Sequence, residues 1–344
     1  MIRPVTELTE KELKNKKVLL RVDFNVPVLN GKILDIYKIK TNKETIDYLV
    51  DRGAVITLLS HITPVESFEP LLEQIKTILE TENFSLYENV RKYKGEEDNN
   101  EEFARDLAKP FDIYINNAFS ESHRNYASVT SVTEFLPSYA GLLLVKEIEN
   151  LGKVITFPKE GKTLIIGGAK VDVKFPVVEN FLDKSENILV GGVVANIFLK
   201  ASGIDIGQSI ADDNFSLKAE SLLSNKQIII PEDFIKENDT ILDIGPKTAE
   251  KFSEIIKNSK FIIWNGSLGK TEIPEMSLGS KKIAEAIVNS GAFSIVGGGD
   301  TITFLRKINL IDEFSYISTG GGAMLQFLAG NKLPGLEALD YYGA

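Results

Sequence analysis

The stretch "AFSIVGGGDTITFLRKI" (292–308) contains the pattern that decides the fold: an apolar β-forming run, three glycines, and then apolar residues at helical spacing. Glycine allows backbone angles and close approaches that a Cβ forbids. A helix that starts here presents free N–H groups and its positive dipole end, which suit an anion. Taken alone, however, the stretch is explained more simply as a tight strand-to-helix turn with Asp300 as the N-cap.

The same arrangement recurs through the second half of the chain. It appears in "KTLIIGGAKVDVKF" (162–175), "NILVGGVVANIFLKA" (187–201) and "FSYISTGGGAMLQFL" (314–328), and "FIIWNGSLGKTE" (261–272) is a further strand that ends in a glycine-rich turn. Several strand ends without side chains at one sheet edge indicate a phosphate-bearing ligand. The repetition therefore favours a binding function over turn geometry alone.

In the first half, strand-like runs also alternate with helical patterns, which predicts an α/β fold with parallel sheets. The predicted strands are "KVLLRVDF" (17–24), "AVITLLSH" (54–61), "FSLYENV" (84–90) and "DIYINNAF" (112–119). The Asn-Gly pair in "VPVLNGKIL" (26–34) predicts a hairpin. The segment 137–155 has helical periodicity, and 156–162 is typical of a linker, so we place a domain boundary there.

These first-half strands end in polar side chains and not in glycines. The side chains include Asp23, Asn25, His61, Arg91 and Arg124. Open parallel sheets bind ligands outside the carboxyl ends of their strands. One half is therefore suited to approach a nucleotide by its backbone, and the other to hold a small charged ligand by its side chains. This layout is typical of a two-substrate phosphoryl-transfer enzyme.

Composition narrows the function classes. The chain has 344 residues, no cysteine and a net charge of −10. The absence of cysteine excludes disulfides, thiolate metal sites and thiol catalysis, and the acidic balance argues against a nucleic-acid partner. No run reaches the roughly 18 apolar residues that span a bilayer. The polar start "MIRPVTELTEKELKNKK" favours a cytoplasmic protein with no membrane partner.

Two rival nucleotide motifs fail. A P-loop needs a glycine five places before the glycine of Gly-Lys-Thr, but the two candidate positions hold Thr156 and Trp264. A dinucleotide fingerprint needs a small residue where the chain has Ile302 or Leu325. These failures make a nicotinamide-dependent oxidoreductase, or an unrelated kinase on an α/β scaffold, a remote alternative. Trp264 is most simply a core aromatic.

Ten motifs spread over essentially the whole chain resemble the phosphoglycerate kinase family, and they occur in the family's order. They are "RVDFNVP" (21–27), "SH" (60–61), "ENVR" (88–91), "AFSESHR" (118–124), "GGAK" (167–170), "DIGPKT" (243–248), "WNG" (264–266), "GGGDT" (297–301), "STGGGA" (318–323) and "LPGLEAL" (333–339). The resemblance implies a glycolytic phosphotransferase with a carboxyl group as acceptor. Its reaction would be reversible phosphoryl transfer between 1,3-bisphosphoglycerate and Mg-ADP, giving 3-phosphoglycerate and ATP.

The resemblance also implies two doubly wound parallel-sheet domains joined by a long helix, here 144–155. Residues 1–155 would form the acid-substrate domain and end in that helix. Residues 156–325 would form the nucleotide domain, and residues 326–344 would return to the N-terminal domain. With the two substrates on separate domains, turnover would require hinge closure, and the enzyme would act as a monomer.

On the nucleotide side, the resemblance assigns roles by position. Lys170 would follow the moving phosphoryl group, and Lys174 would contact the nucleotide phosphates. Glu272 matches a ribose-binding glutamate, Asn265 lies close to the phosphates, and Asp300 would hold Mg²⁺. The remaining matches line the phosphate path: Gly167, Gly168, Gly298, Gly299 and Thr301.

On the acid side, the matching residues are Asp23, Phe24, Asn25, Lys38, His61, Arg91 and Arg124. The resemblance places Lys38, Arg91 and Arg124 with Lys170 as catalytic groups. Arginine suits a ligand with a phosphate at one end and a carboxyl group at the other, because its guanidinium pairs with either in bidentate fashion.

Several positions depart from the family pattern. Lys38 and Pro64 stand where the family has arginines, and Tyr126 and Val193 replace a histidine and a glycine. "WNGSLGKTE" departs from a proline-methionine version, and "PEDFIKENDT" (231–240) replaces a longer connection. Most of these changes affect acid binding, so we expect an active enzyme with a weakened acid site. The alternative is a nucleotide-binding relative whose turnover is lost or strongly reduced.

Overall fold

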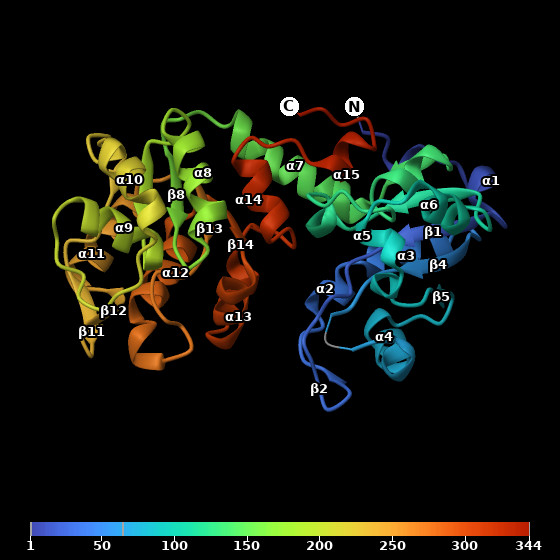
Figure 1. The fold of residues 1–344 in the computed structure, drawn as a ribbon, viewed down its shortest axis with the longest axis horizontal. Coiled ribbons are helices and arrows are strands. Elements are labelled where there is room, and N and C mark those ends of the chain that lie inside the picture. The colour runs from blue at the N-terminus through green and yellow to red at the C-terminus, as the bar shows by residue number, and fades with distance from the viewer. Residues whose placement is uncertain (1, 64, 344) are drawn as a thin grey trace. The chain divides into compact units, whose positions relative to one another are not determined.

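The computed structural model describes residues 2–63 and 65–343, which form two compact units (Figure 1). Unit 1 comprises the residues up to Glu149 together with those from Lys332 on, and unit 2 is Asn150–Asn331. These units divide the chain inside helix α7 (Leu142–Thr156) and just before α15 (Pro334–Glu337), while the domain boundaries at residues 155 and 325 stay predictions. Within the described residues, no helix has both the length and the apolar character needed to cross a membrane.

Unit 1 is built on a five-stranded parallel sheet with the order β5-β4-β1-β6-β7. Its strands are β1 (Lys17–Arg21), β4 (Val55–Leu59), β5 (Ser85–Leu86), β6 (Ile113–Asn116) and β7 (Ser138–Ala140). Its remaining helices are α1 (Glu10–Leu13), α2 (Tyr37–Lys40), α3 (Lys43–Val50), α4 (Leu72–Leu79), α5 (Lys94–Glu97) and α6 (Glu101–Ala108). The central strands β1 and β6 are buried on both faces, which explains their continuous apolar runs.

The predicted hairpin is confirmed. Strand β2 (Val28–Leu29) pairs antiparallel with β3 (Lys32–Ile33). Asn30 and Gly31 make the turn with φ values of 50° and 72°, the left-handed angles that an Asn-Gly turn requires.

The helical prediction for the whole of 137–155 is wrong at its start. Residues Ser138–Ala140 form β7, which pairs in parallel with β6 at the edge of the sheet. Pro137 and Gly141 flank this short strand, and both disfavour a helix interior. The helix α7 begins only after them, at Leu142.

The last residues of the structure pack into unit 1. The backbone N–H of Gly335, in α15, donates to the carbonyl oxygen of Ser122 at 2.8 Å. A Cβ on Gly335 would lie 2.6 Å from the side chain of Val129, so only glycine fits against this segment. The contact ties α15 to the loop that follows β6.

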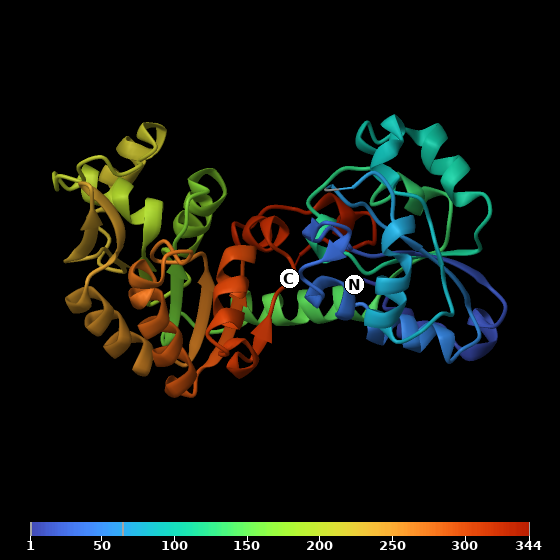
Figure 2. The same ribbon diagram turned by 90° about the horizontal axis from the view of Figure 1, so that it is seen from below.

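Unit 2 has a six-stranded parallel sheet with the order β10-β9-β8-β13-β14-β15 and helices on both of its faces (Figure 2). The strands are β8 (Lys162–Ile166), β9 (Asn187–Val190), β10 (Ile228–Ile229), β13 (Phe261–Asn265), β14 (Phe293–Gly297) and β15 (Tyr316–Ile317). The helices are α8 (Val171–Phe181), α9 (Gly192–Ala201), α10 (Ser216–Leu222), α11 (Pro246–Lys257), α12 (Leu278–Ser290), α13 (Gly299–Lys307) and α14 (Gly322–Leu328). Trp264 is fully buried in the core, as predicted.

Two features of unit 2 differ from the sequence interpretation. Residues 231–240, interpreted as a connection, contribute to a hairpin of β11 (Phe234–Glu237) and β12 (Thr240–Ile244). Asp300 is not the N-cap of α13, because Gly298 takes that position with φ of 99° and the helix starts at Gly299. Asp300 therefore lies in the first helical turn, where a carboxylate interacts favourably with the helix dipole.

Candidate functional site

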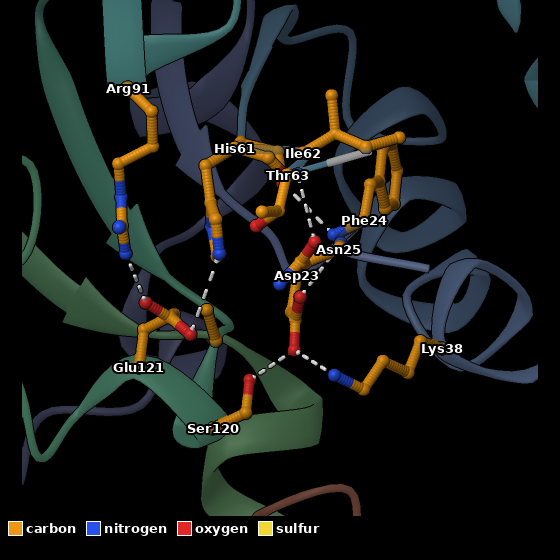
Figure 3. Close-up of polar contacts among 12 residues, drawn as sticks. Asp23, Phe24, Asn25, Lys38, His61, Ile62, Thr63, Arg91, Ser120 and Glu121 are labelled. Atoms are coloured by element: carbon orange, nitrogen blue, oxygen red, sulfur yellow. Dashed lines mark hydrogen bonds and ion pairs between the residues drawn. The ribbon is translucent and has the colours of Figure 1, made fainter. Parts of the chain in front are cut away.

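The polar strand ends of unit 1 meet at Asp23, which follows β1 (Figure 3). Its Oδ2 accepts hydrogen bonds from Lys38 Nζ at 2.9 Å and from Ser120 Oγ at 2.5 Å. Its Oδ1 accepts from the backbone N–H of Asn25 at 2.9 Å. Burial raises the pKa of Asp23, but the charge of Lys38 and these hydrogen bonds outweigh it and lower the pKa to about 2. Asp23 is therefore a carboxylate at neutral pH.

Hydrogen bonds from backbone N–H groups to side-chain oxygens hold together the segments that follow β1 and β4. Ser60 Oγ accepts from the backbone N–H of Phe24 at 2.9 Å, and Asn25 Oδ1 accepts from the N–H of Thr63 at 3.0 Å. The Phe24 side chain is fully buried in the apolar core, where it makes an edge contact with Phe68. Pro64, interpreted as a lost arginine, lies outside the described residues.

His61 and Arg91 lie on either side of Glu121 (Figure 3). His61 Nε2 is 3.9 Å from Glu121 Oε1, and Arg91 Nη2 is 3.5 Å from Glu121 Oε2. Burial and the nearby Arg21 guanidinium lower the pKa of His61 to about 3, so the imidazole is neutral. Arg91 Nη1 also pairs with Glu97 at 2.5 Å.

Tyr126, which replaces a histidine of the family pattern, faces both predicted arginines. The guanidinium of Arg91 lies 4.6 Å from the centroid of its ring, and that of Arg124 lies 5.9 Å away. An aromatic face attracts a guanidinium and restrains its orientation. The tyrosine is therefore an alternative way of positioning these two cations, one of which, Arg124, is exposed.

Sequence reasoning missed two residues of this cluster, Ser120 and Glu121. Both lie in the quoted motif "AFSESHR", within the short 3₁₀ turn Phe119–Glu121. The sequence feature that could have identified Glu121 is its position in the middle of a motif expected to bind an anion. A carboxylate is unexpected there, because it repels an anion. Only Arg124 of this motif is given a role by the sequence analysis.

The glycines at the strand ends of unit 2 serve two different purposes. A Cβ on Gly167 would lie 2.2 Å from the carbonyl oxygen of Ser267, and one on Gly266 would lie 2.1 Å from the oxygen of Gly167. These glycines are required because the turns after β8 and β13 touch. A Cβ on Gly299 or Gly321 would meet nothing within 4 Å. The second pair leaves open space beside the backbone.

The charged residues of unit 2 gather at the starts of α8 and α13. Lys174 is 6% exposed, and its Nζ donates to the carbonyl oxygen of Gly167. Burial lowers its pKa to about 8; the charge of Asp300 opposes this shift and that of Lys170 adds to it. Lys170 and Asp300 are exposed, so the three form a partly buried group of two cations and one anion.

The other predicted nucleotide residues have different surroundings. Asn265 is buried at the end of β13, and Thr301 is fully buried, with its Oγ accepting from the N–H of Gly266 at 3.0 Å. Glu272 is exposed in the turn after β13. The described residues contain no group of three or more histidine, aspartate or glutamate side chains that could hold a metal ion by themselves. A lone carboxylate such as Asp300 nevertheless fits Mg²⁺, which proteins bind through one or two carboxylates together with substrate phosphates.

Comparison with known proteins places the chain in a family. The family description of phosphoglycerate kinase matches residues 8–82 and 65–331. A phosphoglycerate kinase from Dictyoglomus turgidum is 39% identical over 391 aligned positions, covering 98% of this chain and 99% of the relative.

Two solved structures share the fold over nearly their whole lengths. Phosphoglycerate kinase from Coxiella burnetii has a TM-score of 0.88 and 33% identity, with all of both chains covered. That from Pyrococcus horikoshii has a TM-score of 0.88 and 31% identity, with 99% of this chain and 98% of the other covered. The chain is thus an ATP-binding phosphotransferase of glycolysis with a carboxyl group as acceptor, and it belongs to the phosphoglycerate kinase family.

Proposed function

We propose that unit 1 binds 3-phosphoglycerate or 1,3-bisphosphoglycerate at its polar strand ends, and that unit 2 binds Mg-ADP or Mg-ATP at its glycine strand ends. The observation that carries the proposal is the convergence on Asp23. Side chains from separate segments, Lys38 and Ser120 among them, meet there although they are far apart in the sequence. A cluster of this kind at the carboxyl edge of a parallel sheet is the arrangement expected of a small-molecule site.

In the acid site, the cations have distinct tasks. Arg91 and Arg124 bind the anionic groups of the acid, since a guanidinium offers paired donors to phosphate or carboxylate. Lys38, fixed by Asp23, supplies a positive charge without that planar geometry. His61 stays neutral and contributes hydrogen bonds instead of charge.

In the nucleotide site, Lys170 neutralises the charge that develops on the moving phosphoryl group, and Lys174 binds the nucleotide phosphates. Phosphoryl transfer passes through a loose transition state, so that positioning and charge neutralisation carry most of the catalysis. Asp300 would hold the Mg²⁺ that the nucleotide brings, and that ion would neutralise the phosphate oxygens. The exposed position of Lys170 at the start of α8 supports its role, because it leaves the ammonium accessible to a ligand.

A coupled assay with 3-phosphoglycerate and Mg-ATP tests the proposal. We expect turnover that disappears when Mg²⁺ is chelated and returns when it is restored. ATP binding without turnover, under conditions that saturate both substrates, would favour the alternative of a relative that only binds nucleotide. The monomeric state and the cytoplasmic location stay predictions, which light scattering on the purified chain and cell fractionation test.

A further inference from the structure

Glu121 is a buried carboxylate in the acid site with no hydrogen bond to one of its oxygens. The residue is 8% exposed, and Oε2 has no hydrogen-bond partner within the described residues. Its closest cation is Arg91, with Nη2 at 3.5 Å from Oε2. Figure 3 shows the carboxylate between Arg91 and His61, pointing towards both.

Glu96, a second buried glutamate of unit 1, has the hydrogen bonds expected of a carboxylate with a purely structural role. Both oxygens of Glu96 accept hydrogen bonds from Ser128, one from the backbone N–H at 2.8 Å and one from Oγ at 2.6 Å. Buried polar groups are nearly always satisfied in this way. Glu121 lacks such partners, so structural bonding does not explain its burial.

The charged and titratable groups that face Glu121 come from four segments of unit 1. They are Arg21 and Asp23 on and after β1, Lys38 on α2, His61 after β4, and Arg91 after β5. Burial raises the pKa of Glu121, the cations Arg21, Arg91 and Lys38 lower it, and Asp23 raises it further; the net direction is upward. Asp23 is already satisfied by Lys38 and Ser120.

We propose that Glu121 is an internal anion that competes with the acid substrate for Arg91 and thereby sets the affinity of the enzyme for that substrate. The inference rests on the proposed assignment of this cluster as the acid site. An anionic group of the substrate and the Glu121 carboxylate both favour the space beside the same guanidinium. When the substrate binds, Glu121 must either leave Arg91 or take up a proton.

The competition predicts that binding of the acid substrate is coupled to the uptake of a proton. A bound anion close to Glu121 disfavours its charged form further, so binding of the acid draws a proton onto Glu121. By linkage, the affinity for the acid rises as pH falls through the range in which Glu121 titrates. The phosphate of the substrate also titrates, so the effect of Glu121 is the difference between the protein and a variant that lacks its carboxylate.

The test is Glu121→Gln, which keeps the size of the side chain and removes its charge. We expect Kd and KM for 3-phosphoglycerate to fall by roughly tenfold, as for removal of one like charge at a partly screened distance, with little change in kcat. Calorimetry of 3-phosphoglycerate binding in two buffers of different ionisation enthalpy measures the proton uptake, which should be smaller in the variant.

Glu97→Gln is the matched control, because Glu97 also pairs with Arg91 but is exposed. We expect it to leave proton uptake unchanged. Glu121→Ala provides a second variant if the amide does not fold, and proton uptake by the unaltered protein needs no variant at all.

The outcomes separate this inference from the proposed function. The inference would be overturned if the unaltered protein and Glu121→Gln had equal affinity for 3-phosphoglycerate and equal proton uptake. It would also be overturned if the variant bound 3-phosphoglycerate more weakly. In both cases the proposed acid site would stand. Binding by the variant alone would support it. Failure of both to bind 3-phosphoglycerate, with Mg-ATP still bound, would overturn the proposed acid site and this inference with it.

Discussion

The two sheet edges of the molecule are prepared for ligands in opposite ways. At the edge in unit 1, charged side chains already pair with one another: Lys38 with Asp23, and Arg91 with Glu97. At the edge in unit 2, part of the backbone carries no side chain and has open space beside it, since an added Cβ at Gly299 would meet nothing within 4 Å. A ligand in unit 1 must therefore exchange existing ion pairs, whereas a ligand in unit 2 finds open space beside the backbone at Gly299 and Gly321. We expect changes in unit 1 to act mainly on acid affinity and changes in unit 2 mainly on the chemical step or on folding.

The largest expected effect is in unit 2. Lys170→Ala removes the cation proposed to neutralise the moving phosphoryl group, so kcat should fall by roughly two orders of magnitude or more. Nucleotide affinity, measured by equilibrium binding, should change far less. A variant with near-normal kcat would remove Lys170 from its catalytic role and would weaken the contrast between the two edges.

Alanine substitutions should distinguish the two kinds of glycine in unit 2, those required by close packing and those beside open space. Gly167→Ala places a Cβ 2.2 Å from the Ser267 carbonyl oxygen, and it should lower the free energy of unfolding by about 1–3 kcal/mol, the usual range for overpacking. Gly299→Ala meets no atom and lies at the start of α13, so stability should stay the same or rise slightly. Denaturant unfolding gives both values. Equal destabilisation by the two variants would show that Gly299 also has a packing role.

The effect of Lys38→Arg tests whether the acid site is weakened or rebuilt. A planar guanidinium in place of the ammonium adds paired donors, and kcat/KM for 3-phosphoglycerate should rise by about tenfold, equivalent to roughly 1.4 kcal/mol. The matched control is Lys40→Arg, because Lys40 is exposed on the same short helix and should give no change. If Lys38→Arg instead lowers activity while Lys40→Arg does not, the site has been rebuilt around a lysine that pairs with Asp23.

The smallest expected effect concerns pH. The pKa of Lys174 is lowered to about 8, so its ammonium is present below that pH and is lost as pH rises through it. Because phosphate binds only the charged form well, KM for ATP should be constant from pH 6 to about 7.5 and then rise, by at most about tenfold per pH unit. KM measured with saturating acid gives the profile. A flat profile up to pH 9.5 would mean that Lys174 does not bind the phosphates as a cation.

Much of the fold was predictable because its signals are local. The alternation of strands and helices, the Asn30-Gly31 hairpin and the glycine strand ends each depend on residues close together in the sequence. The matches to known phosphoglycerate kinases confirm the fold class, the family and the activity expected from the ten motifs. The roles of individual residues in the site stay predictions.

The features that the sequence did not predict depend on contacts between segments far apart in the chain. Strand β7 has only three residues and exists because the edge of β6 is available to pair with it. The burial of Lys174 and the meeting of Glu121 with His61 arise only when separate loops pack together. Asp300 was misplaced because the left-handed angle of Gly298 moves the helix start, which the residue types alone did not decide.

Unit 1 is discontinuous in sequence, and this has a consequence for biosynthesis. The residues from Lys332 on, which hold Gly335 against Ser122, leave the ribosome after all of unit 2. The loop that carries Glu121, the residue before Ser122, therefore lacks this support while unit 2 is being made. The nascent chain can complete unit 2 before unit 1, although unit 1 was begun first.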